Sequence, residues 1–128
     1  MRTTQYPWLL LAALSVAAAS GCAGKHQEVS YQKDVAPILA ANCTSCHMPG
    51  QPGYVASGLD LSGYDSLMKG TKFGQIVIPG DPLTSVLVML IEGRADPSLK
   101  MPHGGAKPLT KDEIKIIRRW VNQGARNN

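Results

Sequence analysis

Apolar residues between positions 31 and 125 recur at intervals of three and four, which is the spacing of one face of an α-helix. Four segments carry this pattern: residues 34–47, 62–70, 81–93 and 110–124. No stretch alternates apolar and polar residues as a half-buried strand would, and no segment repeats along the chain. The sequence therefore predicts a single all-α domain over residues 31–125.

The first predicted helix leads into a cysteine-histidine motif. Asp34 is a candidate N-cap, and Pro37 falls in the first turn, where proline is tolerated. The residues at helical spacing that follow are Val35, Ile38, Leu39, Asn42, Cys43, Cys46 and His47. We therefore expect one helix face to run from the core into the motif.

A Gly/Pro-rich segment, residues 48–58, follows the motif and predicts a loop. Ser62 is then positioned to cap a short helix that ends at Gly70. Asp81 and Pro82 form an N-cap and first-position pair for the third helix. Its expected inward-facing residues are Leu83, Val86, Leu87, Leu90 and Ile91.

The third helix is expected to end at Gly93. The last helix opens with Thr110 and Glu113, spaced as a capping box, and ends at Gly124. Its expected inward-facing residues are Ile114, Ile117, Trp120 and Val121.

The N-terminus has the organisation of an export signal. Arg2 precedes a largely apolar stretch, residues 8–19, that is too short to span a bilayer, and small residues follow it up to Cys22. A cysteine directly after small residues resembles the lipobox of bacterial lipoproteins. This resemblance implies that residues 1–21 are a lipoprotein signal peptide and that Cys22 is lipidated. The alternative is ordinary signal-peptide cleavage that happens to precede a cysteine.

Residues 22–30 are small or polar and lack periodicity, so they predict a short tether between the lipid and the domain. Such an anchor would hold the protein to a membrane of the cell envelope, on the periplasmic side. Ala23, rather than Asp, follows the lipidated cysteine. By resemblance to lipoprotein sorting in enteric bacteria, this favours the outer membrane.

Composition narrows the function classes. The chain has 128 residues, about one domain, and its formal net charge is +4. Because no basic run or basic patch with interleaved aromatic residues occurs, we expect no nucleic-acid partner. Its three cysteines are an odd number, so disulfides alone cannot explain them in an exported protein.

Two of the cysteines lie in Cys43-Thr44-Ser45-Cys46-His47, which matches the C-x-x-C-H attachment signature of c-type cytochromes. Residues i, i+3 and i+4 share one side of a helical turn. Both thiols can therefore form thioethers to the vinyl groups of one haem while the adjacent imidazole reaches the iron. The motif predicts a single covalently bound haem c, held by Cys43 and Cys46 and ligated by His47.

Two other interpretations of the motif compete with haem attachment. A thioredoxin-like dithiol would require a strand and crossover pattern around it, but the surrounding sequence is helical. A zinc site would require a second pair of ligands, and only His26 and His103 remain, each alone. Both interpretations are less consistent with the sequence than haem attachment.

A low-spin haem iron needs a second axial ligand, usually a thioether or another imidazole. The candidates are Met48, Met68, Met89, Met101 and His103. Met48 adjoins the motif histidine and cannot reach the opposite face of the ring, while Met68 and Met89 lie in apolar helical stretches that favour a core position. Met101 lies in an irregular Pro/Gly loop between two helices, which can fold across the distal face. We therefore predict Met101 as the sixth ligand, with His103 as the alternative.

The order of these elements resembles the mono-haem class I cytochrome c fold, and more narrowly the planctomycete-type cytochrome c domain. The resemblance covers most of residues 31–125. The segments that carry it are 35–39, 58–61, 78–82, 85–87, 101–102 and 120–125. It implies a cytochrome c-like helical fold around one haem c, ligated by His47 and by the Met-Pro methionine, Met101.

Filled axial positions leave no room for a substrate, so the predicted function is an electron carrier between redox partner proteins rather than an enzyme. One alternative is a haem peroxidase-like enzyme, in which a labile Met101 would open the iron and His103 would act in acid-base chemistry. Another is a non-catalytic haem subunit or sensor that docks to a larger oxidoreductase.

Overall fold

The computed structural model describes residue 1 and residues 27–128, so the predicted signal peptide and Cys22 lie outside the described residues. The α-helices are α1 (Ala36–Asn42), α2 (Pro52–Ser57), α3 (Tyr64–Lys69), α4 (Val86–Ile91) and α5 (Lys111–Asn122). A π-helical turn, η1 (Tyr31–Val35), precedes α1, and a 3₁₀ turn, η2 (Pro97–Leu99), follows α4. Strands are absent from residues 27–128, where one isolated bridge joins Thr71 and Gly74. The all-α prediction is confirmed.

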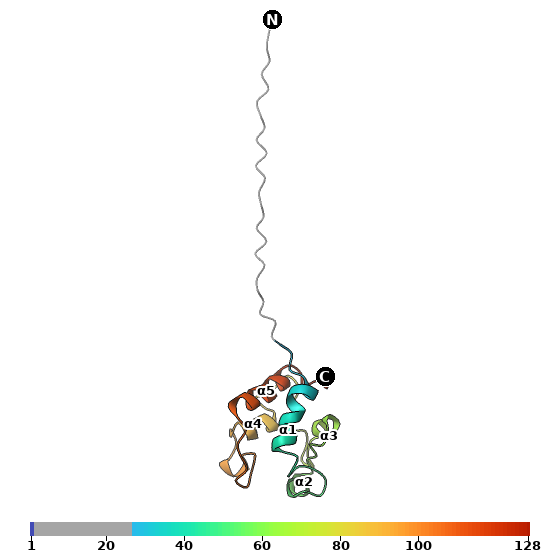
Figure 1. The fold of residues 1–128 in the computed structure, drawn as a ribbon, viewed down its shortest axis with the longest axis vertical. Helices are drawn as coiled ribbons and strands as arrows, with labels where there is room; N and C mark the ends of the chain where they lie inside the picture. The colour runs from blue at the N-terminus through green and yellow to red at the C-terminus, as the bar shows by residue number, and fades with distance from the viewer. Residues whose placement is uncertain (2–26) are drawn as a thin grey trace.

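The core lies where η1, α4 and α5 meet, since η1 and α4 both contact α5 (Figure 1). Side chains with at most 2% of their surface exposed include Val35, Leu39, Leu67, Val88, Ile117, Trp120 and Val121. Three aromatic rings join the elements: Tyr31 lies 5.1 Å from Tyr64 and 5.5 Å from Trp120, centroid to centroid. Within the described residues, no helix has the length and apolar character to cross a bilayer.

The first helical segment begins earlier than predicted. Ser30 is the N-cap: its hydroxyl accepts from the Lys33 N–H at 3.2 Å. The Asp34 carboxylate returns the interaction by accepting from the Ser30 N–H at 2.8 Å. The expectation that Asp34 is the N-cap is wrong, because the serine hydroxyl is placed to satisfy a free N–H of the first turn.

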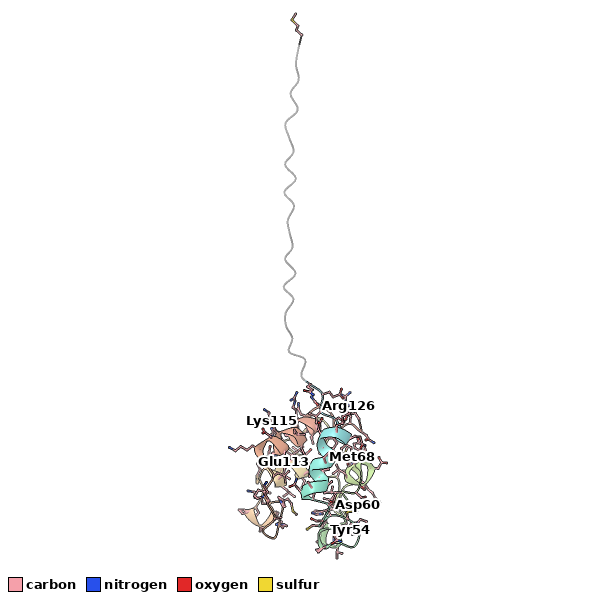
Figure 2. The ribbon with its side chains drawn as sticks, viewed as in Figure 1. Tyr54, Asp60, Met68, Glu113, Lys115 and Arg126 are labelled. Carbon is pink, nitrogen blue, oxygen red and sulfur yellow. The ribbon has the colours of Figure 1, made fainter. Side chains whose placement is uncertain are left out.

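The end of the predicted tether belongs to the folded domain. Val29 is buried, and its N–H donates to the Gln123 side chain at 2.8 Å. Ser30 donates through its hydroxyl to the Asn128 carbonyl at 2.7 Å. Arg126 pairs with Glu28 at 2.9 Å, at the same end of the domain as the N-terminal segment (Figure 2). The two ends of the described domain therefore bind each other through residues 28–30 and residues 123–128.

Helix α2 lies inside the segment that was predicted as a loop. Pro52 occupies its first turn and Gly58, at φ +73°, ends it in the left-handed conformation. For α3 the N-cap is Gly63 rather than the predicted Ser62, whose N–H donates to the Asp60 carboxylate at 2.9 Å. Gly70 ends α3 as expected; a Cβ there would lie 2.5 Å from the Gly74 carbonyl oxygen, so only glycine fits.

The predicted helix at Asp81-Pro82 starts four residues late. The Asp81 carboxylate accepts from the N–H groups of Leu83 and Thr84, so it caps an isolated turn, and α4 begins only after Ser85. Leu83 is 60% exposed, which contradicts its predicted inward position.

The capping box of α5 is confirmed. Thr110 and Glu113 each accept from the other's backbone N–H. These bonds to Thr110 hold the pKa of the Glu113 carboxyl below its usual value. Ile117, Trp120 and Val121 are buried as predicted, while Ile114 is partly buried against the core.

Candidate functional site

The cysteine-histidine motif begins at the C-terminal end of α1. Cys43 is the C-cap, and its N–H donates to the Leu39 carbonyl at 2.8 Å. The N–H groups of Cys46 and His47 both donate to the Cys43 carbonyl, at 3.1 and 3.0 Å. The predicted continuous helix therefore stops at Asn42, yet one further turn of backbone still brings the two thiols and the imidazole together.

The backbone around His47 is fixed by two neighbouring segments. The Tyr54 N–H of α2 donates to the Cys46 carbonyl at 3.0 Å, and the Leu61 N–H donates to the His47 carbonyl at 2.8 Å. Gly53 of α2 approaches the imidazole itself: a Cβ there would lie 2.8 Å from Cε1 and 3.0 Å from Nδ1 of His47. Helix α2 thus packs against the Nδ1 side of the ring, and Nε2 is the nitrogen farther from it.

The surroundings of the His47 imidazole favour its neutral form, which is the form that ligates metals. Burial lowers its pKa; the backbone of Leu59 has a smaller opposing effect, and the positive charge of His103 lowers the pKa further. Its Nδ1 is buried and has no hydrogen-bond partner of normal geometry among the described residues. Because α2 covers the Nδ1 side of the ring, Nε2 is the nitrogen that the imidazole can present to a metal.

The two motif thiols differ in environment. Both are free, with Cys46 exposed and Cys43 partly buried. Burial, together with the negative charges of Cys46 and Glu113, raises the pKa of Cys43 to about 11. A redox-active dithiol needs a lowered thiol pKa, so this environment argues against the thioredoxin-like interpretation. Within residues 27–128 no three His, Cys, Asp or Glu side chains are grouped as a metal site, which disfavours a zinc site as well.

The loop that carries Met101 is hydrogen-bonded to the last turn of α4. The Met101 N–H donates to the Leu90 carbonyl at 3.3 Å, and the Met101 side chain is partly buried against the core. His103 is exposed, but its charge acts on the pKa of His47, so the two rings are within electrostatic reach. The structure therefore ties Met101 to α4 and the core, and His103 lies two residues further along the same loop.

The sequence did not reveal the residues that support His47. Gly53 and Leu61 act through backbone position, and nothing in their residue types distinguishes them from ordinary loop residues. Met68 packs against the core as predicted, and Met48 is 41% exposed next to the motif. Neither residue gives a reason to revise the choice between Met101 and His103.

The comparisons with known proteins agree with this geometry. The family model described as planctomycete cytochrome C matches residues 43–104, from the first motif cysteine through the Met101 loop. Residues 43–104 are therefore similar to a planctomycete cytochrome c domain. A cytochrome c domain implies haem c as its cofactor, in agreement with the prediction from the motif.

The domain is also similar to part of a larger protein. It is 28% identical, over 127 aligned positions, to hydrazine synthase subunit alpha of Kuenenia stuttgartiensis, an alignment that covers 79% of this chain and 16% of the relative. The solved structure of Kuenenia stuttgartiensis hydrazine synthase superposes with a TM-score of 0.53 and 26% identity, covering 76% of this chain and 16% of that one. The chain therefore spans about a sixth of the proteins it matches.

The residues present fit haem c. Two thiols lie one turn apart, a buried imidazole follows them directly, and a partly buried thioether lies in the loop after α4. These are the donor types of a c-type haem with histidine and methionine ligands.

Proposed function

We propose that this protein is a mono-haem c-type cytochrome and serves as an electron carrier. Cys43 and Cys46 would hold one haem c through thioethers, with His47 as one axial ligand. The observation that carries the proposal is the buried His47 ring, which α2 covers on its Nδ1 side, held directly after two thiols on the same backbone turn. The bound haem supplies the one-electron redox chemistry.

Met101 is the proposed sixth ligand. Its backbone is tied to α4 and its side chain is already partly buried, so a thioether can be presented without ordering the loop anew. Histidine with methionine raises the reduction potential relative to two histidines. With both axial positions filled by His47 and Met101, the protein excludes substrate from the metal and acts through electron transfer alone.

We further propose that residues 1–21 are a lipoprotein signal peptide and that lipidated Cys22 anchors the protein on the periplasmic side of the cell envelope, with the outer membrane favoured. The described chain begins beside α5 and the C-terminus, at the end of the domain opposite α2 (Figure 1). An anchor at that end would leave the α2 end, which supports the haem motif, directed towards redox partner proteins.

A second candidate is a haem-bearing subunit of a larger oxidoreductase. The observation in its favour is that this chain is similar to 16% of a larger protein, hydrazine synthase subunit alpha. In this case the protein would relay electrons within a complex rather than between soluble partners.

The test is to express the full chain with a cytochrome c maturation system and to record its mass and its visible and near-infrared spectra. We expect one covalent haem, a sulfur-to-iron band in the ferric state, and no reaction of the ferrous protein with carbon monoxide. Rapid binding of carbon monoxide or peroxide would instead indicate an open iron and support a peroxidase-like enzyme or a sensor. Replacing Met101 by Ala should abolish the sulfur band, and its survival would move the ligand assignment to another residue.

A further inference from the structure

The end of α4 carries an ion-pair cluster that has no role in the proposed function so far. The Glu92 carboxylate, whose side chain is 17% exposed, lies between two arginines. One oxygen accepts from Arg118 of α5 at 2.8 Å, and the other pairs with Arg94. Glu92 thus connects the C-terminal end of α4 to the middle of α5.

Arg94 extends the cluster back to the start of the α4 region. Its guanidinium donates to the carbonyls of Leu83 and Pro82, at 3.0 and 3.2 Å. Its own N–H donates to the Met89 carbonyl at 2.9 Å. The turn before α4, the last turn of α4 and α5 are therefore held in one arrangement by Glu92, Arg94 and Arg118.

The loop of Met101 is bound to the last turn of α4. The chain leaves α4 at Gly93, which has φ +67°, and returns so that the Met101 N–H reaches the Leu90 carbonyl. The Lys100 side chain packs over Gly93, with its carbon atoms 3.4 Å from where a Cβ would lie. The position of Met101 is thus set by the last turn of α4, which the cluster fixes.

We propose that Glu92 and Arg118 are positioning residues for Met101: they hold the α4 end so that the thioether stays on the iron. This inference rests on the proposed function, in which Met101 is the sixth ligand. An added ligand binds only the fraction of molecules in which the thioether is off, so its apparent affinity reports that fraction. Loosening the cluster should therefore tighten the binding of added imidazole to the ferric protein.

The experiment titrates matured ferric wild type, Arg118→Ala, Arg118→Lys and Arg126→Ala with imidazole, following the near-infrared sulfur band. Arg126→Ala is the matched control, because it breaks the Glu28 ion pair at the other end of the domain. For the loss of one partly buried ion pair, Arg118→Ala should bind imidazole about threefold to tenfold more tightly than wild type. Arg118→Lys, which keeps the charge, should recover part of this difference, and the control should stay within about twofold.

An imidazole affinity of Arg118→Ala equal to that of Arg126→Ala would overturn the inference while leaving the ligand assignment intact. Absence of the sulfur band from the wild type would instead overturn the assignment of Met101 and the inference with it. If Arg118→Ala does not mature, Glu92→Gln provides the second variant, since it removes the charge and keeps the side-chain shape. It should shift the affinity in the same direction, and an unchanged affinity would count against the inference.

Discussion

Replacing Gly53 by Ala tests whether α2 holds the His47 ring. The new methyl group would lie 2.7 Å from the Cys46 carbonyl oxygen and 2.8 Å from Cε1 of His47, distances shorter than van der Waals contact. Backbone and ring must therefore shift. Overpacking of this kind costs about 1–3 kcal/mol, and the better helix propensity of alanine offsets about 0.5–1 kcal/mol of it.

The net expectation for Gly53→Ala is a loss of up to about 2.5 kcal/mol in the free energy of unfolding, which lowers the melting temperature by up to about 20 °C for a domain of this size. The assay is thermal unfolding of the matured protein followed at the haem absorbance, together with the haem yield per protein. Gly63→Ala is the control, because no atom lies within 4 Å of a Cβ there and its φ of −164° suits any residue. Because Gly63 is an N-cap, the control should cost between a few tenths of a kcal/mol and roughly 1 kcal/mol in the free energy of unfolding. Equal stability and haem yield in the two variants would refute the reasoning.

Three further predictions concern the helical framework. Thr110→Ala removes the hydroxyl of the α5 capping box and should cost about 1 kcal/mol in urea unfolding; an unchanged midpoint would contradict it. Because the folded-state pKa of Glu113 is lowered, the stability from its bonds is present above its unfolded pKa and is lost as pH falls through the folded value. The stability gap between wild type and Thr110→Ala should therefore narrow on acidification below about pH 4, and a constant gap would argue against this coupling. Ile117→Ala, at a side chain with 0% exposure, should cost about 2–5 kcal/mol, whereas Val55→Ala, at 69% exposure, should change the free energy by at most about 0.5 kcal/mol; similar values for both would contradict the assigned core.

Much of the helical framework follows from local sequence. The capping box at Thr110 and Glu113, with apolar residues at helical spacing behind it, predicts α5 because all of its determinants lie within one segment. Helix α2 escaped prediction because its six residues carry no apolar periodicity, and its packing against His47 is a tertiary contact. Asp81 misled because an aspartate caps an isolated turn as readily as a helix.

The candidate site likewise has a part that local sequence predicts and a part that depends on tertiary contacts. The thiols and the imidazole of residues 43–47 are adjacent in the chain, so their grouping can be read directly from the sequence. The supports of the site come from distant segments. Residue types reveal neither the contact of Gly53 with the ring nor the hydrogen bond from Met101 to Leu90. Both are backbone contacts that the fold creates.

The central claim is that Cys43 and Cys46 bind one haem covalently, with His47 as its axial ligand. The most direct measurement is the intact mass of matured full-length protein, before and after extraction with acidified acetone, beside a Cys43→Ala, Cys46→Ala double variant. The account predicts the added mass of one haem that survives extraction in the wild type and is missing after extraction in the variant. A colourless wild type, or a haem that acetone removes from it, would contradict the claim.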